Sequence, residues 1–381
     1  MLPLLSYLES LLPSATELDG WSCIYVQHLL RSNCDCAEFL LKRGLAKSKL
    51  RIFGKAYSTS GVALKYYKDR GFNAKSIGEG YDYSSPFDHG LIVSIREALS
   101  SILAQGERNI LLIDEGGLAL QAAASFTQRD IRFAVAELTA RGAHHYNLLQ
   151  HRAPIIDVAR SDAKKRIEAP LIARSMATLL GCRLQELGAG SLSATRVGLV
   201  GAGAIGGALA SELQAAGAIV SIFDTMDVRA TSKGIRELLI DAEVVTSSTG
   251  QGMDWSELVT SLRDGTVLAN CGSSDIEFQP WRLRARFEPQ QAFNVQVPSR
   301  PWRGNLSTGT DGHHVTLLGG GFPVNFDGSP DPIPAREIQL TRAILMAGAI
   351  QAVTSRNLGI IALDAGLQTQ IAVRYNELLA C

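Results

Sequence analysis

The chain lacks an excess of charge of either sign, because 37 lysine and arginine residues balance 37 aspartate and glutamate residues. A balanced chain has no global basic field to attract nucleic acid or an anionic membrane, so we expect neither as a partner. Its longest charge-free apolar stretch, around Val197–Ser211, is shorter than the ~20 residues that a membrane-spanning helix needs. The N-terminal segment MLPLLSYLESLLPS has no basic lead, which does not indicate a secretory signal.

Cysteine is also scarce, and the six cysteines are spread along the chain: Cys23, Cys34, Cys36, Cys182, Cys271 and Cys381. They form neither a disulfide framework nor a paired CxxC motif, and no acid or cysteine stands at ligand spacing beside the His-His pairs. We therefore expect no metal site, reduced thiols and a cytoplasmic protein.

With 381 residues, 46% of them apolar, the chain is long enough for about two domains at roughly 100–200 residues each. Buried-strand patterns at Leu50–Phe53, Asn109–Asp114 and Arg132–Val135 are each followed by helical spacing. Such alternation predicts an α/β fold with mostly parallel sheets. The segment that contains Tyr25, Leu29 and Leu30 has the spacing of an amphipathic helix.

The strongest motif is the G-x-G-x-x-G of Gly201, Gly203 and Gly206, which directly follows the apolar run Val197–Val200. The first glycine permits a tight turn, the second lets a pyrophosphate approach the backbone, and the third allows close packing of helix on strand. The following helix, opening with Ala204 and Ile205, would offer free N–H groups to phosphates. This motif predicts a Rossmann-type domain.

A second strand, Ile219–Phe223, ends in Asp224, which lies 224 − 203 = 21 residues after Gly203. A carboxylate there can accept hydrogen bonds from the ribose hydroxyls and would repel a 2′-phosphate, which favours NAD over NADP. FAD, or a nucleotide with a structural role, remains an alternative.

Around this unit the chain resembles the S-adenosylhomocysteine hydrolase family, from about residue 50 to residue 349. The family's turn of two acids and two glycines after a strand matches Asp114–Gly117. Its lysine followed four residues later by an acid matches Lys164 and Glu168. The resemblance implies that Lys164, Glu168 and Glu115 are catalytic. From the residues alone, Lys164 and Glu168 equally suit a surface ion pair, and Glu115 suits an acid near a helix N-terminus.

The cofactor half of the family pattern also has matches. A Thr-Gly turn corresponds to Thr249 and Gly250, and an Asn-x-Gly turn corresponds to Asn270 and Gly272. The segment LLGGGFPVNF resembles a strand ending in Val-Asn, which implies that Asn325 holds the nicotinamide carboxamide. The resemblance thus implies bound NAD and, as in the family, a homo-oligomer.

Family enzymes oxidise the ribose 3′-hydroxyl of their substrate with tightly bound NAD, eliminate the 5′ thioether, add water and return the hydride. This chain departs from the pattern on the substrate side. Tyr57, in GKAYST, stands where the family has a catalytic histidine, and Ser273 replaces another histidine. The phenol of Tyr57 is a candidate acid, or a buried hydrogen-bonded tyrosine. These departures favour oxidation of a hydroxyl on a nucleoside-like substrate over hydrolysis of S-adenosylhomocysteine itself.

Three functions therefore stay open: internal oxidation and reduction as in the family, a simple NAD-dependent dehydrogenase, and a catalytically silent NAD-binding regulator, which the missing histidines would favour. We expect residues 190–330 to form the NAD-binding Rossmann domain. Residues 1–189, completed by helices within 331–381, would form a second α/β domain that binds the substrate, with the active site in the cleft between them.

Overall fold

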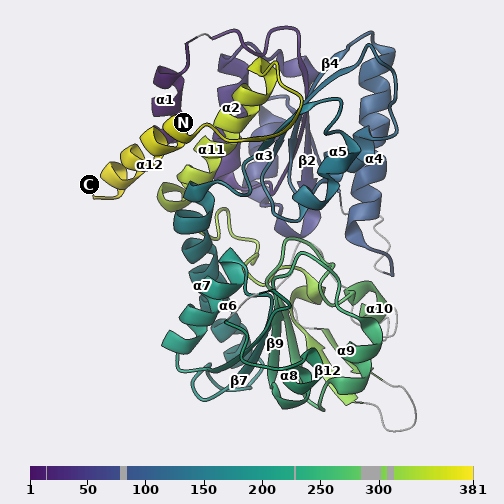
Figure 1. Cartoon of the computed structure of the whole chain (residues 1–381), viewed down its shortest axis with the longest axis vertical. Coiled ribbons are helices and arrows are strands. Elements are labelled where there is room, and N and C mark those ends of the chain that lie inside the picture. Colours follow the sequence, from purple (N-terminus) through teal and green to yellow (C-terminus); the bar gives the residue numbers. More distant parts are fainter. Residues whose placement is uncertain (14, 78–83, 227–228, 285–301, 307–312, 381) are drawn as a thin grey trace. The chain divides into compact units, whose positions relative to one another are not determined.

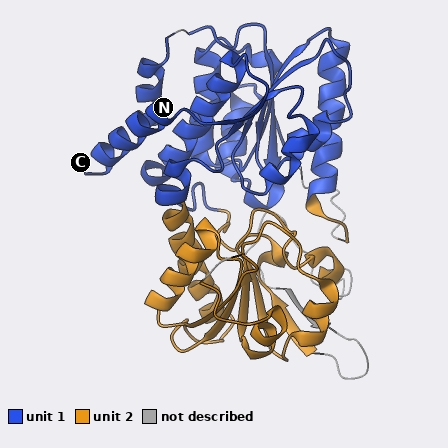
Figure 2. Ribbon diagram, in the orientation of Figure 1, with its two compact units in different colours: residues 1–79, 88–168, 329–381 blue, residues 80–87, 169–328 orange. Residues whose placement is uncertain are grey.

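The computed structural model describes residues 1–381 except 14, 78–83, 227–228, 285–301, 307–312 and 381. Its contacts divide the chain into two compact units (Figure 2). Unit 1 comprises residues 1–79, 88–168 and 329–381, and unit 2 comprises residues 80–87 and 169–328. Each unit is built on its own, largely parallel sheet, so the predicted α/β fold with a doubly wound Rossmann-type domain and a second α/β domain is confirmed (Figure 1).

Unit 1 contains a seven-stranded sheet in the order β13-β6-β5-β4-β1-β2-β3. Its strands are all paired in parallel, and they are β1 (Ser22–Gln27), β2 (Leu50–Lys55), β3 (Asn73–Ile77), β4 (Asn109–Asp114), β5 (Arg132–Glu137), β6 (Pro154–Asp157) and β13 (Gly359–Ala362). The chain winds outward from β1 in one direction through β2 and β3, and in the other through β4, β5 and β6. The sheet therefore has its topological switch point between β1 and β4.

The helices of unit 1 cover both faces of this sheet, and they are α1 (Pro3–Leu11), α2 (Arg31–Lys42), α3 (Gly61–Asp69), α4 (Phe87–Ala104, whose first residue is assigned to unit 2), α5 (Leu118–Ala123), α11 (Ala335–Thr354) and α12 (Ala365–Ala380). Helix α11 is buried from Ile338 to Val353 except at Gln351, and it packs against β4, β5 and β6. A segment from the end of the chain thus forms the centre of a core begun by the first residues.

Unit 2 contains a six-stranded sheet in the order β11-β12-β10-β9-β7-β8. Its strands are β7 (Arg196–Val200), β8 (Ile219–Phe223), β9 (Val244–Ser247), β10 (Val267–Asn270), β11 (Trp302–Leu306) and β12 (His313–Leu317). Only the β11–β12 pair is antiparallel. The helices are α6 (Ala169–Glu186), α7 (Ala204–Ala215), α8 (Ile235–Asp241), α9 (Trp255–Ser261) and α10 (Pro280–Arg284). The switch point of this sheet lies between β7 and β9.

Two expectations differ from the structure. The helix predicted around Tyr25–Leu30 is wrong, because Ser22–Gln27 is the central strand β1, buried on both faces. Helix α6 belongs to unit 2, where its residues pack in the core around α7, so the contacts place the boundary at Ala169 rather than at residue 190.

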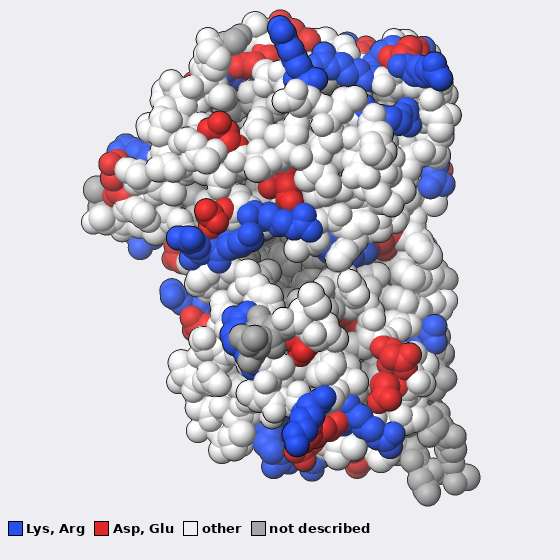
Figure 3. All heavy atoms as spheres, viewed as in Figure 1, with Lys and Arg blue, Asp and Glu red and all other residues white. Residues whose placement is uncertain are grey.

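None of the helices that the model describes is long and apolar enough to cross a membrane. On the face shown in Figure 3, basic and acidic side chains are interspersed with uncharged surface, and neither sign covers the face. This distribution matches the equal numbers of acidic and basic residues in the sequence.

Candidate functional site

The glycine-rich turn of unit 2 has the geometry that its sequence predicts. Gly201 follows β7 with φ of +95°, a backbone conformation that side chains other than glycine rarely adopt. A Cβ at Gly206 would overlap the carbonyl oxygen of Gly201 and approach Ser248 Oγ at 2.7 Å. These glycines let the chain leave the sheet sharply and let α7 pack directly over the turn.

The first turn of α7 begins at Gly203, which is the N-cap residue and makes no side-chain cap. Among the described residues, no heavy atom beyond its own chain neighbours and the helix backbone lies within 4 Å of the position that a Gly203 Cβ would occupy. The guanidinium of Arg229 lies against Gly207 in the same turn and donates to the carbonyl of Ala202. The helix dipole and the first backbone N–H groups, at Ala204 and Ile205, favour an anion at such a position.

Asp224 follows β8 at the same edge and is half-buried. Its Oδ2 accepts a hydrogen bond from the backbone N–H of Ala202 at 2.7 Å, and its Oδ1 accepts one from the N–H of Met226 at 2.8 Å. The carboxylate is therefore fixed beside the glycine-rich turn.

The loop after β9 is held by a carboxylate that the sequence analysis missed. Glu277 accepts hydrogen bonds from Thr249 Oγ1 at 2.6 Å, from the N–H of Gly250 at 2.8 Å and from Ser247 Oγ at 2.5 Å. Burial raises the pKa of Glu277. Thr249 and Gly250 thus lie at the switch point, and Glu277 positions them. The sequence gives no sign of this role, because Glu277 belongs to no motif.

Two predicted cofactor residues, Asn270 and Asn325, differ in whether their side-chain amides are hydrogen-bonded within the protein. The amide of Asn270 is engaged within the protein: Nδ2 donates to the carbonyls of Ser274 and Gly321, and Oδ1 accepts from the N–H of Gly272 at 2.7 Å. Asn325 is held beside the end of β10, since the preceding residue donates its N–H to the carbonyl of Asn270 at 2.9 Å. Asn325 is 5% exposed, and among the described residues its Oδ1 has no hydrogen-bond partner.

In unit 1, the carboxyl ends of β1, β2 and β4 bring together a histidine, a lysine and a glutamate. His28 Nε2 lies 2.5 Å from Glu115 Oε1, and Lys55 Nζ lies 3.2 Å from the same oxygen. Lys55 is fully buried and Glu115 is 3% exposed. The imidazole and the ammonium group together hold the pKa of Glu115 well below its usual range, despite burial.

His28 is held from both sides. Its Nδ1 lies 2.5 Å from Ser58 Oγ, and its ring packs edge-on against Tyr57 with centroids 5.8 Å apart. Desolvation lowers the pKa of His28, which favours a neutral ring at pH 7. With Nε2–H donating to the Glu115 carboxylate, Nδ1 is the acceptor for the serine hydroxyl.

The sequence analysis found Tyr57 where the related family has a histidine, and the structure places a histidine from another strand, His28, against Tyr57. Sequence analysis missed His28 because the surrounding segment has the apolar spacing of a helix. If Ser22–Gln27 is taken as a buried strand, the position directly after its carboxyl end becomes a candidate for chemistry. Tyr57 itself is 1% exposed and lies against His28.

The glycine turn after β4 is built around two buried acids. Asp114 accepts hydrogen bonds from the backbone N–H of Glu115 at 2.8 Å and from two N–H groups of α5. Glu137 accepts from the N–H of Gly116 at 3.1 Å and of Gly117 at 3.0 Å. Burial and the neighbouring Asp114 charge raise the pKa of Glu137 to about 8. Glu115 is thereby held at a fixed position after β4.

Lys164 and Glu168 lie in a π-helical turn, η4 (Lys164–Glu168), that leads into α6. The Lys164 Nζ lies 2.8 Å and 2.7 Å from the two carboxylate oxygens of Glu168. The two side chains are 17% and 8% exposed, so this is a largely buried pair rather than a surface one. π-Helical turns occur often at functional sites.

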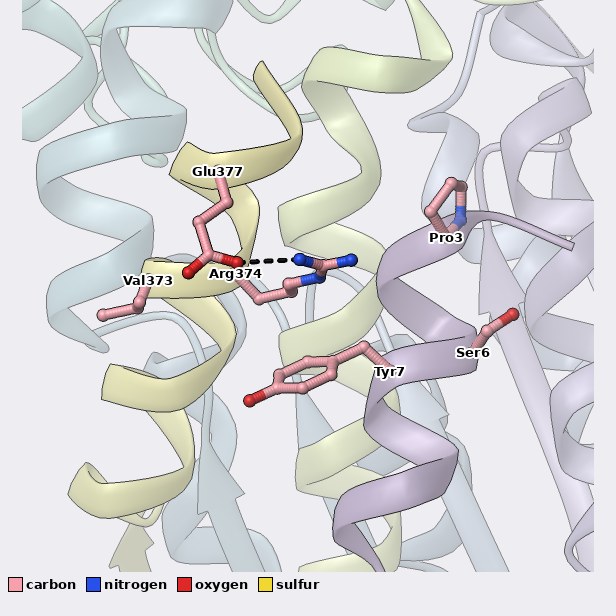
Figure 4. Close-up of a pocket in the computed structure, with 6 residues that line it drawn as sticks. All are labelled: Pro3, Ser6, Tyr7, Val373, Arg374 and Glu377. Carbon is pink, nitrogen blue, oxygen red and sulfur yellow. Dashed lines mark hydrogen bonds and ion pairs between the residues drawn. The ribbon is translucent and has the colours of Figure 1, made fainter. Parts of the chain in front are cut away.

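A cavity of about 380 Å³ lies elsewhere in unit 1, between α1 and α12 (Figure 4). Tyr7 lines it from α1, and Arg374 and Glu377 line it from α12, joined by an ion pair of 2.8 Å. None of the predicted site residues lines this cavity, and no residue of either glycine-rich turn does.

No protein-family model matches the chain. Among curated proteins it is similar to two uncharacterized proteins from two strains of Mycobacterium tuberculosis, each 29% identical over 340 residues, which cover 88% of this chain. The chain spans 65% of the length of these relatives.

Among solved structures the chain is similar to a pyruvate reductase of Chlamydomonas reinhardtii, with 13% identity, a TM-score of 0.44 and coverage of 90% of this chain and 100% of the other. It is also similar to NAD⁺-bound 3-phosphoglycerate dehydrogenase of Entamoeba histolytica, with 13% identity, a TM-score of 0.38 and coverage of 69% and 76%. An NAD-complexed D-isomer-specific 2-hydroxyacid dehydrogenase of Lactobacillus delbrueckii matches with 14% identity, a TM-score of 0.33 and coverage of 68% and 73%.

Proposed function

We propose that this protein is an NAD-dependent oxidoreductase that oxidises a hydroxyl group of a small, nucleoside-like molecule. The observation that carries the proposal is the glycine-rich turn at the switch point of unit 2, with Asp224 fixed beside it. This combination is the arrangement by which parallel α/β sheets bind dinucleotides.

The residues present fit NAD. The N–H groups of Ala204 and Ile205, in the first turn of α7, would hold the pyrophosphate, and Asp224 would accept hydrogen bonds from the adenosine ribose. The unpartnered Oδ1 of Asn325 would accept from the carboxamide. When bound, NAD supplies a hydride acceptor. Asn270 would position the neighbouring turn rather than contact the cofactor, because both its amide groups are engaged.

The residues of unit 1 would handle the hydroxyl proton. In a neutral His28 that donates Nε2–H to Glu115, the basic nitrogen is Nδ1, which contacts Ser58 Oγ. The proton of the substrate hydroxyl would therefore pass to Ser58 Oγ as the Ser58 proton passes to Nδ1, and Glu115 would stabilise the imidazolium that forms. The Lys164–Glu168 pair is the second candidate, as the resemblance to S-adenosylhomocysteine hydrolases implies. Because a buried histidine, His28, lies beside Tyr57, the absence of a histidine at position 57 argues less strongly for a catalytically silent regulator.

Binding of NAD tests the first part of the proposal. Titration calorimetry of the purified chain should detect NAD binding, with NADP bound more weakly because Asp224 repels the 2′-phosphate. Asp224→Arg should weaken NAD binding by at least about tenfold, since it removes the acceptor and adds bulk. The control is Asp241→Arg, because Asp241 is exposed at the end of α8. Equal NAD affinity in all three proteins would refute the placement of the ribose.

A second experiment separates a simple dehydrogenase from internal oxidation and reduction. The protein is denatured after purification, and the released nucleotides are identified by mass spectrometry. NAD retained in near-stoichiometric amount favours the internal cycle of the S-adenosylhomocysteine hydrolase family. Freely exchanging NAD, with absorbance at 340 nm that grows steadily when substrate is added, favours the dehydrogenase. Nucleosides and 2-hydroxy acids are the two substrate classes to compare.

A further inference from the structure

The last residue of β1, Gln27, is fully buried, yet its amide is not used within the protein. Gln27 is 0% exposed, and among the residues that the structure describes neither Oε1 nor Nε2 has a hydrogen-bond partner. A primary amide carries two donors and an acceptor, and buried polar groups of proteins are almost always paired. Leaving both ends of this amide unpaired opposes folding, so its presence calls for a partner from outside the protein.

Gln27 lies at the switch point of the unit 1 sheet, where α/β sheets bind ligands. The next residue is His28, which contacts Glu115 at the end of the neighbouring strand β4. A second buried and unpartnered polar side chain, Ser60, follows β2, and its N–H donates to the carbonyl of Leu29 at 2.8 Å. The backbone of Ser60 is thus tied to the segment that follows β1.

Two of the cations near this edge are already paired with acids. Lys55 is paired with Glu115, and Arg141 is paired with Asp88. A further cation, Arg342, is buried and donates from Nε to Ser32 Oγ at 3.2 Å. A neutral polar ligand would leave the two ion pairs intact.

We propose that Gln27 determines specificity by binding a neutral substrate group that presents a hydrogen-bond donor and an acceptor side by side, such as an amide or the edge of a nucleobase. Its Oε1 accepts from the donor of the ligand, and its Nε2 donates to the acceptor. The inference deepens the proposed function, on which it rests for the reaction, but its test does not require that reaction.

Thermal unfolding without ligand tests whether the amide is unused. Gln27→Met and Gln27→Leu replace it with apolar side chains of similar size, so both should raise the Tm, by about 2 °C or more. The control is Gln105→Met, because Gln105 is exposed after α4, and its Tm should equal that of the wild type. A lower Tm in both Gln27 variants would show that the amide stabilises the free protein, and would overturn the inference.

Calorimetry with three probes tests recognition, in the presence and in the absence of NAD. Adenosine presents the donor and the acceptor, purine riboside lacks the amino donor, and lactate is an anionic hydroxy acid. Adenosine should bind the wild type at least about tenfold more tightly than purine riboside, and Gln27→Met should remove this preference. Equal adenosine affinity in both proteins, or binding of lactate without adenosine, would overturn the inference. If the wild type binds adenosine but not NAD, that result counts against the proposed function and not against this inference. Gln27→Met should bind NAD with the same affinity as the wild type.

Discussion

Removing the charge of Glu115 should destabilise unit 1 more than any other single change at its switch point. Glu115→Gln leaves Lys55, which is fully buried and 3.2 Å from the carboxylate, without an anion. Breaking a buried ion pair by removal of one partner costs about 3–5 kcal/mol. Lys55→Met should cost less, about 1–3 kcal/mol, because Glu115 keeps its contact with His28 at 2.5 Å.

The double variant distinguishes this electrostatic explanation from loss of packing. If the stranded ammonium is the cause, Glu115→Gln combined with Lys55→Met should be more stable than Glu115→Gln alone, by about 1–3 kcal/mol. Hydrogen exchange in increasing urea, followed by mass spectrometry of peptides that cover β2 and β4, measures the free energy of unfolding of unit 1. Peptides from β7 report unit 2 and should not change. Additive losses in the double variant would refute the reasoning.

The stability of the wild type and that of Glu115→Gln should depend differently on pH. The pKa of Glu115 is depressed in the folded protein, so its contribution to stability is present above the ordinary value of 4.5 and is lost as the pH falls below it. The urea midpoint of unit 1 should therefore decline below pH 4.5 in the wild type and less steeply in Glu115→Gln. Parallel acid limbs in the two proteins would contradict an ionised Glu115.

Three further outcomes follow from the structure. In the folded protein the pKa of Glu137 is raised from 4.5 to about 8, so its contribution to stability is full below pH 4.5 and is lost as the pH rises toward 8. In a series of urea midpoints measured against pH, Glu137→Gln should therefore reduce the decline between pH 4.5 and 8. Gly206→Ala should abolish NAD binding in calorimetry, because its Cβ would overlap Gly201 O, whereas Gly234→Ala, with open space at its Cβ, should not. Lys164→Ala should lower turnover far more than NAD affinity, and an equal loss in both would indicate a structural role.

The geometry of the glycine-rich turn and of Asp224 beside it could be predicted from the sequence because its signal is local. One short segment contains the strand, the glycines and the first turn of α7, and Asp224 follows at the end of the next strand. The spacing itself dictates that these residues share one edge of a parallel sheet. The environment of Asn270 could not be found in this way, since its partners depend on how the turn after β10 closes on Gly321.

The cluster at the carboxyl ends of β1, β2 and β4 could not be predicted because its contacts join distant strands. Glu115, His28 and Lys55 meet only because β1 lies between β4 and β2, an order that no local pattern reveals. The error at Tyr25–Leu30 has a related cause. A central parallel strand is buried on both faces and therefore has a continuous apolar run, without the alternation that marks a half-exposed strand.

The late return of the chain to unit 1 has a consequence for biosynthesis. All of unit 2 is synthesised by residue 328, so its sheet can close on the ribosome while unit 1 still lacks α11. Until residues 335–354 emerge, the apolar faces of β4, β5 and β6 that α11 covers stay exposed to solvent or to chaperones. A nascent chain halted just before Ala335 should therefore yield a protease-resistant unit 2 beside a protease-sensitive unit 1.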